Sequence, residues 1–354
     1  MRTLFSALAS LKLGITLLIA LCVLMATGTV LEKQHGPLYA QWLVYDSPIF
    51  VSLIGLLATN ILASALIRLP FQKRLTGFYI IHLGILTLLA GALVSSLWGY
   101  EGDLELVPNQ AVDTITSKDP ALFVYFIESN EDDVVQLSMP LPKKVYGFKA
   151  ADKDLLGFGL KSSDRHLLHL DNYTIAVSDF VPFADPHNIQ TMRLPQSSDE
   201  PRVMSAHIEI TGITDSAPFK ETWITNAHPA HIELKNNELC VLVLGNEEHE
   251  LPFEVTLNKF EMGVDPNTNE PTSYTSFVTT RDDEAVENKI ISMNQPLKKE
   301  GLRFYQSSFF QMDDGQYGSV LSVNFDPGRT TKYAGSALIV AGGLMHIFLR
   351  RRKK

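Results

Sequence analysis

The stretch FYIIHLGILTLLAGALVSSLW, residues 78–98, contains no Asp, Glu, Lys or Arg and decides the fold class of this chain. Three further uncharged stretches have the same apolar character, at residues 13–31, 48–67 and 333–349. Each approaches the roughly 20 residues that a ~30 Å hydrocarbon core requires, and in that core a segment must pair its own backbone groups within a helix. The sequence therefore predicts a membrane protein with four transmembrane α-helices.

Basic residues fix the predicted orientation. They lie before the first span, in the loop between the second and third, and at the end of the chain: Arg2, Lys12, Arg68, Lys73, Arg74 and residues 350–354. Four crossings place all of them on one side, which the positive-inside rule makes cytoplasmic, with both termini there. The small residues Ala26, Thr27 and Gly28 after an apolar run also permit a cleaved signal peptide in place of the first span.

Polar and small residues inside the spans are expected to serve helix packing. Glycines permit close approach of membrane helices and recur in the third and fourth spans: Gly84, Gly91, Gly335, Gly342 and Gly343. Hydroxyl and amide side chains in lipid are expected to form hydrogen bonds between helices: Thr16, Thr27, Thr29 and Asn60.

Residues 99–330 are predicted to form one large extracytoplasmic β-rich domain, a sandwich or irregular barrel. Apolar and polar residues alternate at 206–210, 253–257 and 321–325, which is typical of half-buried strands. Turn-forming residues are predicted to separate strands at 244–248, 265–271 and 313–315. The domain boundaries that follow are 1–98 for three helices, 99–330 for the β-rich domain, and 331–354 for the fourth helix and a basic cytoplasmic tail.

Charge and cysteine content exclude several functions. The predicted β-rich domain holds 37 of the 39 acidic residues but only 18 of the 30 basic ones, which argues against a nucleic-acid partner because such binding neutralises phosphates. Cys22 and Cys240 form no CxxC motif, so the chain is not itself a thiol oxidoreductase. No P-loop, G-x-S-x-G or G-x-G-x-x-G motif occurs. We therefore assign no catalytic residue.

His82 is the main candidate for chemistry, because it lies about four residues inside the third span. An ionisable residue within a membrane is a functional candidate, and imidazole is a common axial ligand of haem iron. The alternative is a packing histidine that bonds to a neighbouring helix. His346 occupies a matching position in the fourth span, so a bis-histidine site near the cytoplasmic face is conceivable. At that depth, however, His346 can also reach the interface.

The histidine pairs at residues 166/169 and 228/231 have i, i+3 spacing. Without cysteine partners or an HExxH pattern, they are better interpreted as exposed loop residues than as a metal site.

Five segments carry a resemblance to a known family: Leu-Ala-Ser-Leu-Lys-Leu-Gly-Ile-Thr-Leu (8–17), Phe-Tyr-Ile-Ile-His-Leu-Gly-Ile-Leu (78–86), Met-Asn-Gln-Pro-Leu (293–297), Gly-Leu-Arg-Phe-Tyr-Gln-Ser-Ser-Phe (301–309) and Asp-Pro-Gly-Arg-Thr-Thr-Lys-Tyr-Ala-Gly (326–335). In this order and on this topology they resemble the ResB/CcsB proteins of system II cytochrome c maturation. The last three segments are the most specific, and the resemblance extends over nearly the whole chain.

The resemblance implies a haem-delivery and scaffold subunit in the bacterial inner (cytoplasmic) membrane, one part of a cytochrome c haem lyase complex and not catalytic alone. Its implied partners are a ResC/CcsA-type membrane protein, an apocytochrome c and a thioredoxin-like thiol reductant. The implied cofactor is haem b, held transiently and shared with the ResC/CcsA-type protein. His82 matches the family's axial haem ligand, and the second ligand is expected from that partner. Only Trp42, Trp98 and Trp223 occur, so the partner's Trp-rich haem motif is absent here.

Two alternatives remain. A membrane-anchored extracytoplasmic ligand-binding or sensor protein without haem would need the helices only as anchors. A respiratory haem-b subunit would need several paired membrane histidines, whereas only His82 and His346 lie in predicted spans.

Overall fold

A computed structural model of the chain describes residues 2–127, 134–141, 166–169, 173–197, 200–212, 219–233, 239–268, 271–282 and 285–351. By internal contacts the chain divides into two compact units. The first unit contains residues 1–20, 52–117 and 248–354, and the second contains residues 21–51 and 118–247. Each unit combines helical and strand segments that lie far apart in the sequence.

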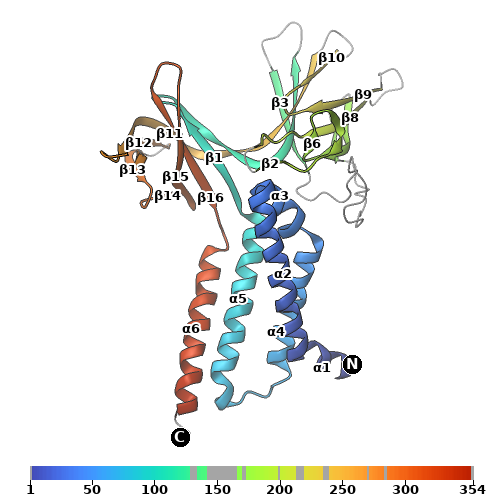
Figure 1. The fold of residues 1–354 in the computed structure, drawn as a ribbon, viewed down its shortest axis with the longest axis vertical. Coiled ribbons are helices and arrows are strands. Elements are labelled where there is room, and N and C mark those ends of the chain that lie inside the picture. The colour runs from blue at the N-terminus through green and yellow to red at the C-terminus, as the bar shows by residue number, and fades with distance from the viewer. Residues whose placement is uncertain are drawn as a thin grey trace. The chain divides into compact units, whose positions relative to one another are not determined.

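In the described part of the chain, the predicted apolar stretches lie, except for Ile67, in the four longest helices, and shorter helical segments lie before or between them (Figure 1). In chain order they are α1 (Arg2–Leu8), α2 (Leu11–His35), α3 (Pro37–Ala40), the π-helical turn η1 (Gln41–Tyr45), α4 (Pro48–Leu66), the 3-10 turn η2 (Lys73–Leu75), α5 (Thr76–Trp98) and α6 (Arg329–Arg351). Three segments are long and apolar enough to cross a membrane, namely α2, α4 and η2 with α5. Predicted span 333–349 lies within α6, and its crossing of the membrane stays a prediction.

In the first unit, antiparallel strands enclose one apolar core. The strands are β1 (Tyr100–Leu106), β2 (Ala111–Ile127), β11 (Leu239–Val264), β12 (Pro271–Arg281), β13 (Val286–Ser292), β14 (Leu297–Lys299), β15 (Leu302–Gln311) and β16 (Tyr317–Phe325). β16 pairs with both β1 and β15, while β12 pairs with β11 and β13. Ser276 on β12 donates to or accepts from Ser319 on β16 at 2.7 Å, and both side chains are buried. The two groups of strands therefore face each other across the core, as a sandwich or barrel requires.

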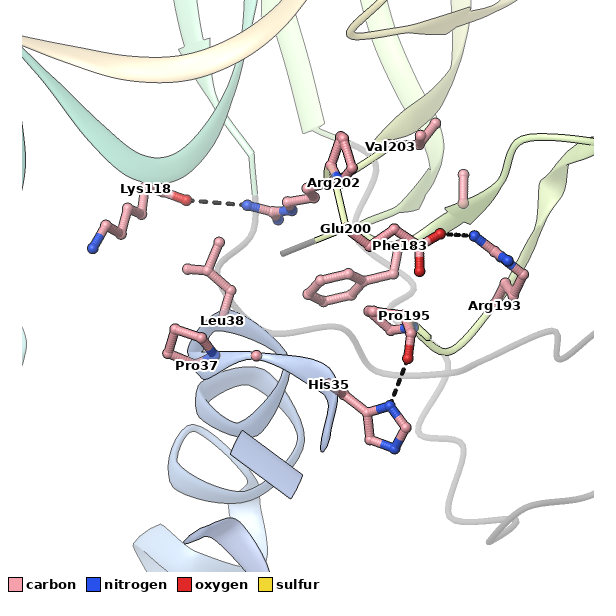
Figure 2. Close-up of a pocket in the computed structure, with 13 residues that line it drawn as sticks. His35, Pro37, Leu38, Lys118, Phe183, Arg193, Pro195, Glu200, Arg202 and Val203 are labelled. Atoms are coloured by element: carbon pink, nitrogen blue, oxygen red, sulfur yellow. Dashed lines mark hydrogen bonds and ion pairs between the residues drawn. The ribbon is translucent and has the colours of Figure 1, made fainter. Parts of the chain in front are cut away.

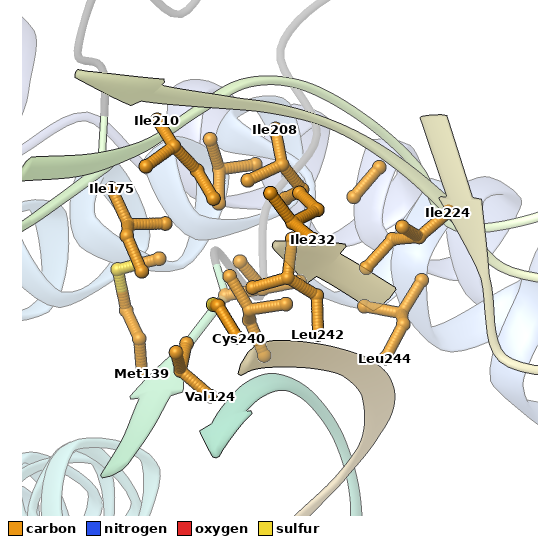
Figure 3. Close-up of a cluster of buried hydrophobic side chains, with 14 of the residues drawn as sticks. Val124, Met139, Ile175, Ile208, Ile210, Ile224, Ile232, Cys240, Leu242 and Leu244 are labelled. Carbon is orange, nitrogen blue, oxygen red and sulfur yellow. The ribbon is translucent and has the colours of Figure 1, made fainter. Parts of the chain in front are cut away.

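The second unit is a β-sandwich with its own core. Its strands are β3 (Val134–Pro140), β4 (His166–His169), β5 (Tyr173–Val181), β6 (Ala184–Asp185), β7 (Asn188–Met192), β8 (Ser205–Gly212), β9 (Lys220–Thr225) and β10 (Ala230–Glu233), with the adjoining parts of β2 and β11. The sheet β4-β5-β8-β9 contributes one layer of the buried cluster, and β2, β3, β10 and β11 contribute the other. Figure 3 shows the isoleucine and leucine side chains of both layers around Cys240. Burial there raises the pKa of the Cys240 thiol to about 12, so it stays protonated and unreactive at neutral pH.

Alternation predicted strands more reliably than composition predicted turns. The alternating segments 206–210, 253–257 and 321–325 lie in β8, β11 and β16, and their apolar members are buried as predicted except Phe325, which is half-buried. The turn at 313–315 is confirmed, with Gly315 at φ 82°. Residues 266–268 also form a turn, while 269–270 lie outside the described residues.

The predicted turn at 244–248 is wrong, because β11 runs through it without a break. At this point β11 passes from the second unit into the first. A Cβ added to Gly245 would lie 3.1 Å from the Phe123 ring. The glycine therefore provides space for a neighbouring side chain at this point of the strand.

The two apolar cores lie within the stretch 99–330, which was predicted from the sequence to form one domain. Because β2 and β11 each run through both units, no composition shift or linker marks the division in the sequence.

Asn60, a buried amide in α4, satisfies the backbone at the break between α1 and α2. Its Nδ2 donates to the carbonyl oxygens of Leu8 at 2.5 Å and Ser10 at 3.0 Å. The predicted interhelical hydrogen bond of Asn60 is thus confirmed. For the threonines the prediction is wrong. Each hydroxyl donates its hydrogen to the carbonyl four residues earlier in α2, and none bonds to another helix within the described residues: Thr16, Thr27 and Thr29.

Candidate functional site

Two rows of glycines fix the position of α5 against α6. The glycines recur every seven residues along both helices, which Figure 1 shows side by side: Gly77, Gly84 and Gly91 on α5, Gly335 and Gly342 on α6, and Gly328 in the turn directly before α6. A Cβ added to Gly84 would lie 2.8 Å from the carbonyl oxygen of Gly335 and 2.8 Å from the backbone nitrogen of Ile339. The two backbones are therefore in direct contact, in the way that small residues allow membrane helices to pack.

The pairing of these glycines shows that the helices are antiparallel. Gly77 near the start of α5 lies against Gly342 near the end of α6, while Gly91 lies against Gly328. Of the glycines expected to promote close approach, Gly343 alone has open space beside it. We call the six glycines in backbone contact the glycine seam: Gly77, Gly84, Gly91, Gly328, Gly335 and Gly342.

His82 lies on the face of α5 that points away from the glycine seam. At 3.6 residues per turn, His82 is rotated by about 140° from Gly77 and about 160° from Gly84. Because α6 covers the glycine face, it leaves the His82 face free for a different neighbour. The side chain is half-buried in the isolated chain.

One hydrogen bond fixes the tautomer of His82. Its Nδ1 lies 2.9 Å from the carbonyl oxygen of Phe78, one helical turn earlier. Since a carbonyl only accepts, Nδ1 carries the proton and donates it, and Nε2 of the neutral ring keeps its lone pair. Within the described residues no hydrogen bond engages Nε2. A histidine that donates one ring N–H to a carbonyl and presents the other nitrogen has the arrangement typical of a metal ligand.

Aromatic and cationic groups surround the imidazole on its own side of α5. The Phe78 and His82 ring centroids are 3.8 Å apart, and the Arg68 guanidinium lies 4.7 Å from the Phe78 centroid. The Tyr79 hydroxyl donates to the Arg68 carbonyl at 2.6 Å. These contacts hold the ring in place and bring a positive charge near it. Phe78 and Arg68 were not predicted as neighbours of His82. Phe78 could have been, because a residue four positions earlier in a helix lies on the same face.

The structure does not bring His346 and His82 together. The backbone nitrogen and Cα of His346 lie against Gly77, within the glycine seam, and its side chain is exposed. His82 points from the opposite face of α5, so the two imidazoles do not share a centre. A bis-histidine site within this chain is therefore not formed.

The other histidine pairs form no cluster with metal-binding geometry in the described part of the chain. His228 is exposed, and its backbone N–H donates to the Thr225 hydroxyl at 3.1 Å. His231 is exposed on β10. His166 and His169 belong to β4, but their side chains lie outside the described residues.

The segment Asp326-Pro-Gly-Arg joins the β-strands to the helix pair. Asp326 accepts hydrogen bonds from the Ser95 hydroxyl at 2.5 Å and the Lys332 ammonium at 2.7 Å. Burial would raise the pKa of Asp326, but the hydrogen bonds from Lys332 and Ser95 outweigh it and hold the pKa below its usual range. The carboxylate thus ties the end of α5 to the start of α6. This contact gives the most specific of the sequence motifs a structural role.

The residues around His82 fit one axial position of an iron porphyrin. They provide a neutral imidazole with a free nitrogen, an aromatic neighbour and a nearby cation. They do not provide a second protein ligand, since His346 lies elsewhere. Within the described residues, the site around His82 therefore offers one protein ligand.

Comparison with known proteins agrees with the motifs. The ResB-like family matches residues 231–318, from β10 into β16. Protein NrfI of Wolinella succinogenes is 25% identical over 351 residues, which cover 94% of this chain and 34% of NrfI. The chain thus spans about a third of the length of that relative. The resemblance predicted from the sequence motifs is confirmed.

Proposed function

We propose that this chain, which is similar to the ResB-like family over residues 231–318, acts in cytochrome c biogenesis as the subunit that receives haem in the membrane and supports its delivery to an apocytochrome c. The observation that carries this proposal is the His82 site. A neutral imidazole, whose Nε2 makes no hydrogen bond within the described residues, lies on the face of α5 opposite to the one that packs against α6.

The proposed topology has four spans, with α6 as the fourth. Its apolar part, residues 333–349, packs along α5 through the glycine seam, and the antiparallel pairing returns the chain to the side where α5 begins. The basic clusters then share the cytoplasmic face, and both sets of strands lie outside it. In this orientation His82 lies about 6 Å inside the cytoplasmic boundary, since it follows the start of residues 78–98 by four positions at 1.5 Å each.

His82 would hold one face of the haem iron, and a ResC/CcsA-type partner would supply the opposite ligand. The partner would pack on the open face of α5, where an iron bound to Nε2 would lie. The chain alone then has no catalytic task, because thioether formation also requires an apocytochrome c whose cysteines a thioredoxin-like protein keeps reduced. Cys240 is too deeply buried to serve as that reductant.

The test is co-purification of the full chain with a ResC/CcsA-type partner in mild detergent. We expect haem b in the complex, with a Soret band that falls several-fold in His82→Ala. Added imidazole should restore the band, because it can fill the space left by the missing ring. The matched control is His346→Ala, which removes a membrane histidine from α6 and should leave the spectrum unchanged.

Two results would contradict the proposal. The first is a colourless wild-type complex, which would favour a membrane-anchored ligand-binding or sensor protein without haem. The second is a His82→Ala complex with the wild-type spectrum and normal holocytochrome c in cells, which would assign His82 to packing.

A further inference from the structure

A cavity in the second unit lies beside the outer end of α2. Its volume is about 220 Å³, and its lining combines the chain just after α2 with residues of the β-sandwich (Figure 2). A second cavity of about 330 Å³ shares three lining residues with it: Leu38, Lys118 and Arg202. Arg202 therefore lines both cavities.

Two hydrogen bonds hold the Arg202 side chain in place, but one nitrogen of its guanidinium has no hydrogen-bond partner within the described residues. Its Nε donates to the Pro182 carbonyl at 3.0 Å, and its Nη1 donates to the Lys118 carbonyl at 3.2 Å. Its Nη2 is buried and has no hydrogen-bond partner within the described residues. A buried, charged donor left unpaired is costly, so this nitrogen is expected to have a partner in the working protein.

Aromatic rings keep the guanidinium in the charged, oriented form. Its carbon lies 5.3 Å from the Trp42 ring centroid and 5.2 Å from that of Phe183, within range of a cation–π interaction. Burial lowers the pKa of Arg202 to about 10, while the nearby charge of Asp119 raises it. The group is thus still cationic at neutral pH. Its two bonded partners are neutral carbonyls, and no carboxylate accepts a hydrogen bond from it within the described residues.

The other charged residues of the cavity leave a positive excess. Arg193 donates to Glu200, so these two charges neutralise each other. Lys118 is exposed at the rim, and His35 bonds through Nδ1 to the Pro195 carbonyl at 2.6 Å. Of the charged residues that line the cavity, Arg202 and Lys118 form no ion pair with another lining residue, while the charge of Asp119, which is not part of the lining, lies near Arg202. An anion is the ligand that this combination favours.

The position of the cavity indicates where the anion comes from. α2 is an apolar helix long enough to cross a membrane, and it ends at His35 on the wall of the cavity. Pro37, Leu38 and Phe183 add apolar surface to the same wall. A polar head with an attached hydrocarbon part would suit both surfaces. At about 220 Å³ the cavity lies below the usual range for a whole drug-sized ligand, so it fits a head group only.

We propose that this cavity binds the anionic head group, a phosphate or a carboxylate, of an amphiphile lying at the membrane surface, with Arg202 as the main donor and Lys118 at the rim. The planar guanidinium, clamped by two carbonyls, presents Nη2 to one oxygen of the anion. This site lies on different residues from His82 and stands independently of the proposed function.

Binding is tested on the full chain in maltoside micelles by native mass spectrometry. The probes are dihexanoyl phosphatidylglycerol, dihexanoyl phosphatidylcholine, inorganic phosphate and metal-free protoporphyrin, which carries carboxylates but no iron for His82. We expect the anionic lipid to bind at least about tenfold more tightly than the zwitterionic one, and Arg202→Gln to remove that preference, because one charged hydrogen bond contributes this much. The control Arg281→Gln removes an equal charge from a side chain 66% exposed in the first unit and should change nothing.

The arms separate the possible sources of the anion. Tighter binding of the lipid assigns a phosphate head group, tighter binding of the porphyrin assigns a carboxylate arm, and competition by inorganic phosphate alone assigns a free anion. Arg202→Lys keeps the positive charge but loses the planar guanidinium, so this variant should fold even where Arg202→Gln does not. It should bind the anion several-fold more weakly than wild type. Equal binding of both lipids by the wild type without tighter binding of the porphyrin, competition by inorganic phosphate alone, or wild-type binding by the Arg202 variants would overturn the proposal.

Discussion

The glycine seam makes a sharp prediction from two adjacent residues of α6. Gly342→Ala and Gly343→Ala introduce the same methyl group into the same helix. At Gly342 the new Cβ would lie 2.7 Å from the backbone nitrogen of Ile81 and 3.0 Å from the carbonyl oxygen of Gly77. At Gly343 nothing lies within 4 Å of the new atom. We therefore expect Gly342→Ala to be destabilising and Gly343→Ala to be tolerated.

The size of the difference follows from the atoms involved. Two of the three atoms nearest to the Cβ at Gly342 belong to the backbone of α5, and the third is Cγ1 of Ile81 at 2.8 Å. Rotation of the Ile81 side chain would not clear the backbone atoms, so the helices must move apart. Overpacking of this kind costs about 1–3 kcal/mol. Both variants gain the helix propensity of Ala over Gly, about 0.8–1 kcal/mol in water, but that gain cancels in the comparison. Gly342→Ala should therefore be about 1–3 kcal/mol less stable than Gly343→Ala.

The measurement is reversible unfolding of both variants in mixed micelles of increasing denaturing-detergent fraction, followed by circular dichroism. A second readout is a disulfide engineered across α5 and α6, which should form more slowly in Gly342→Ala. Equal unfolding midpoints for the two variants would refute the direct backbone contact, and with it the placement of His82 on the open face.

Three further predictions concern groups outside the glycine seam. Asp326→Asn should lower the free energy of unfolding by about 1–3 kcal/mol, because the charged hydrogen bond to Lys332 is lost. The folded-state pKa of Asp326 is depressed, so this stabilisation is complete above about pH 4. It disappears as the pH falls through the folded-state pKa, and the acid unfolding curves of wild type and variant should therefore converge. Asn60→Ala should cost about 1–3 kcal/mol in detergent unfolding, since two carbonyls lose their donor; Thr59→Ala, which affects a bond within α4 only, should stay near wild type. In a Cys22→Ser background, a maleimide should label Cys240 only after unfolding, and rapid labelling of the native protein at pH 7 would contradict its burial.

Much of the fold could be predicted because it rests on local patterns. Uncharged stretches of sufficient length predicted the helices, and the alternation at 206–210, 253–257 and 321–325 predicted strands whose inner residues are buried. The prediction of a turn at 244–248 was wrong because Gly and Asn occur both in turns and in long strands. In β11 the glycine makes space for the ring of Phe123. The two separate cores could not be predicted, since their division falls within single strands.

The candidate site shows the same limit at the level of single residues. His82 could be found from the sequence because an ionisable residue stands out in an apolar run. Its free Nε2 could not, because that depends on which ring nitrogen reaches the Phe78 carbonyl. The face of α5 that packs against α6 could have been predicted from the sequence, since the seven-residue spacing of glycines is visible in both stretches. The position of His82 on the opposite face would have followed. Arg202 had no local signal, because its neighbours Trp42 and Phe183 lie far away in the chain.

The glycine seam and the His82 site are parts of one arrangement. Direct contact between backbones fixes the rotation of α5 about its axis more tightly than flexible side chains would, since backbone atoms have no alternative rotamers. A seam on one face therefore determines where His82 points on the other, and Asp326 holds the far end of the same helix pair in register. A change at Gly342 should then weaken haem retention without touching His82, whereas a change at Gly343 should not. Loss of haem in both variants would mean that α5 is oriented by another contact.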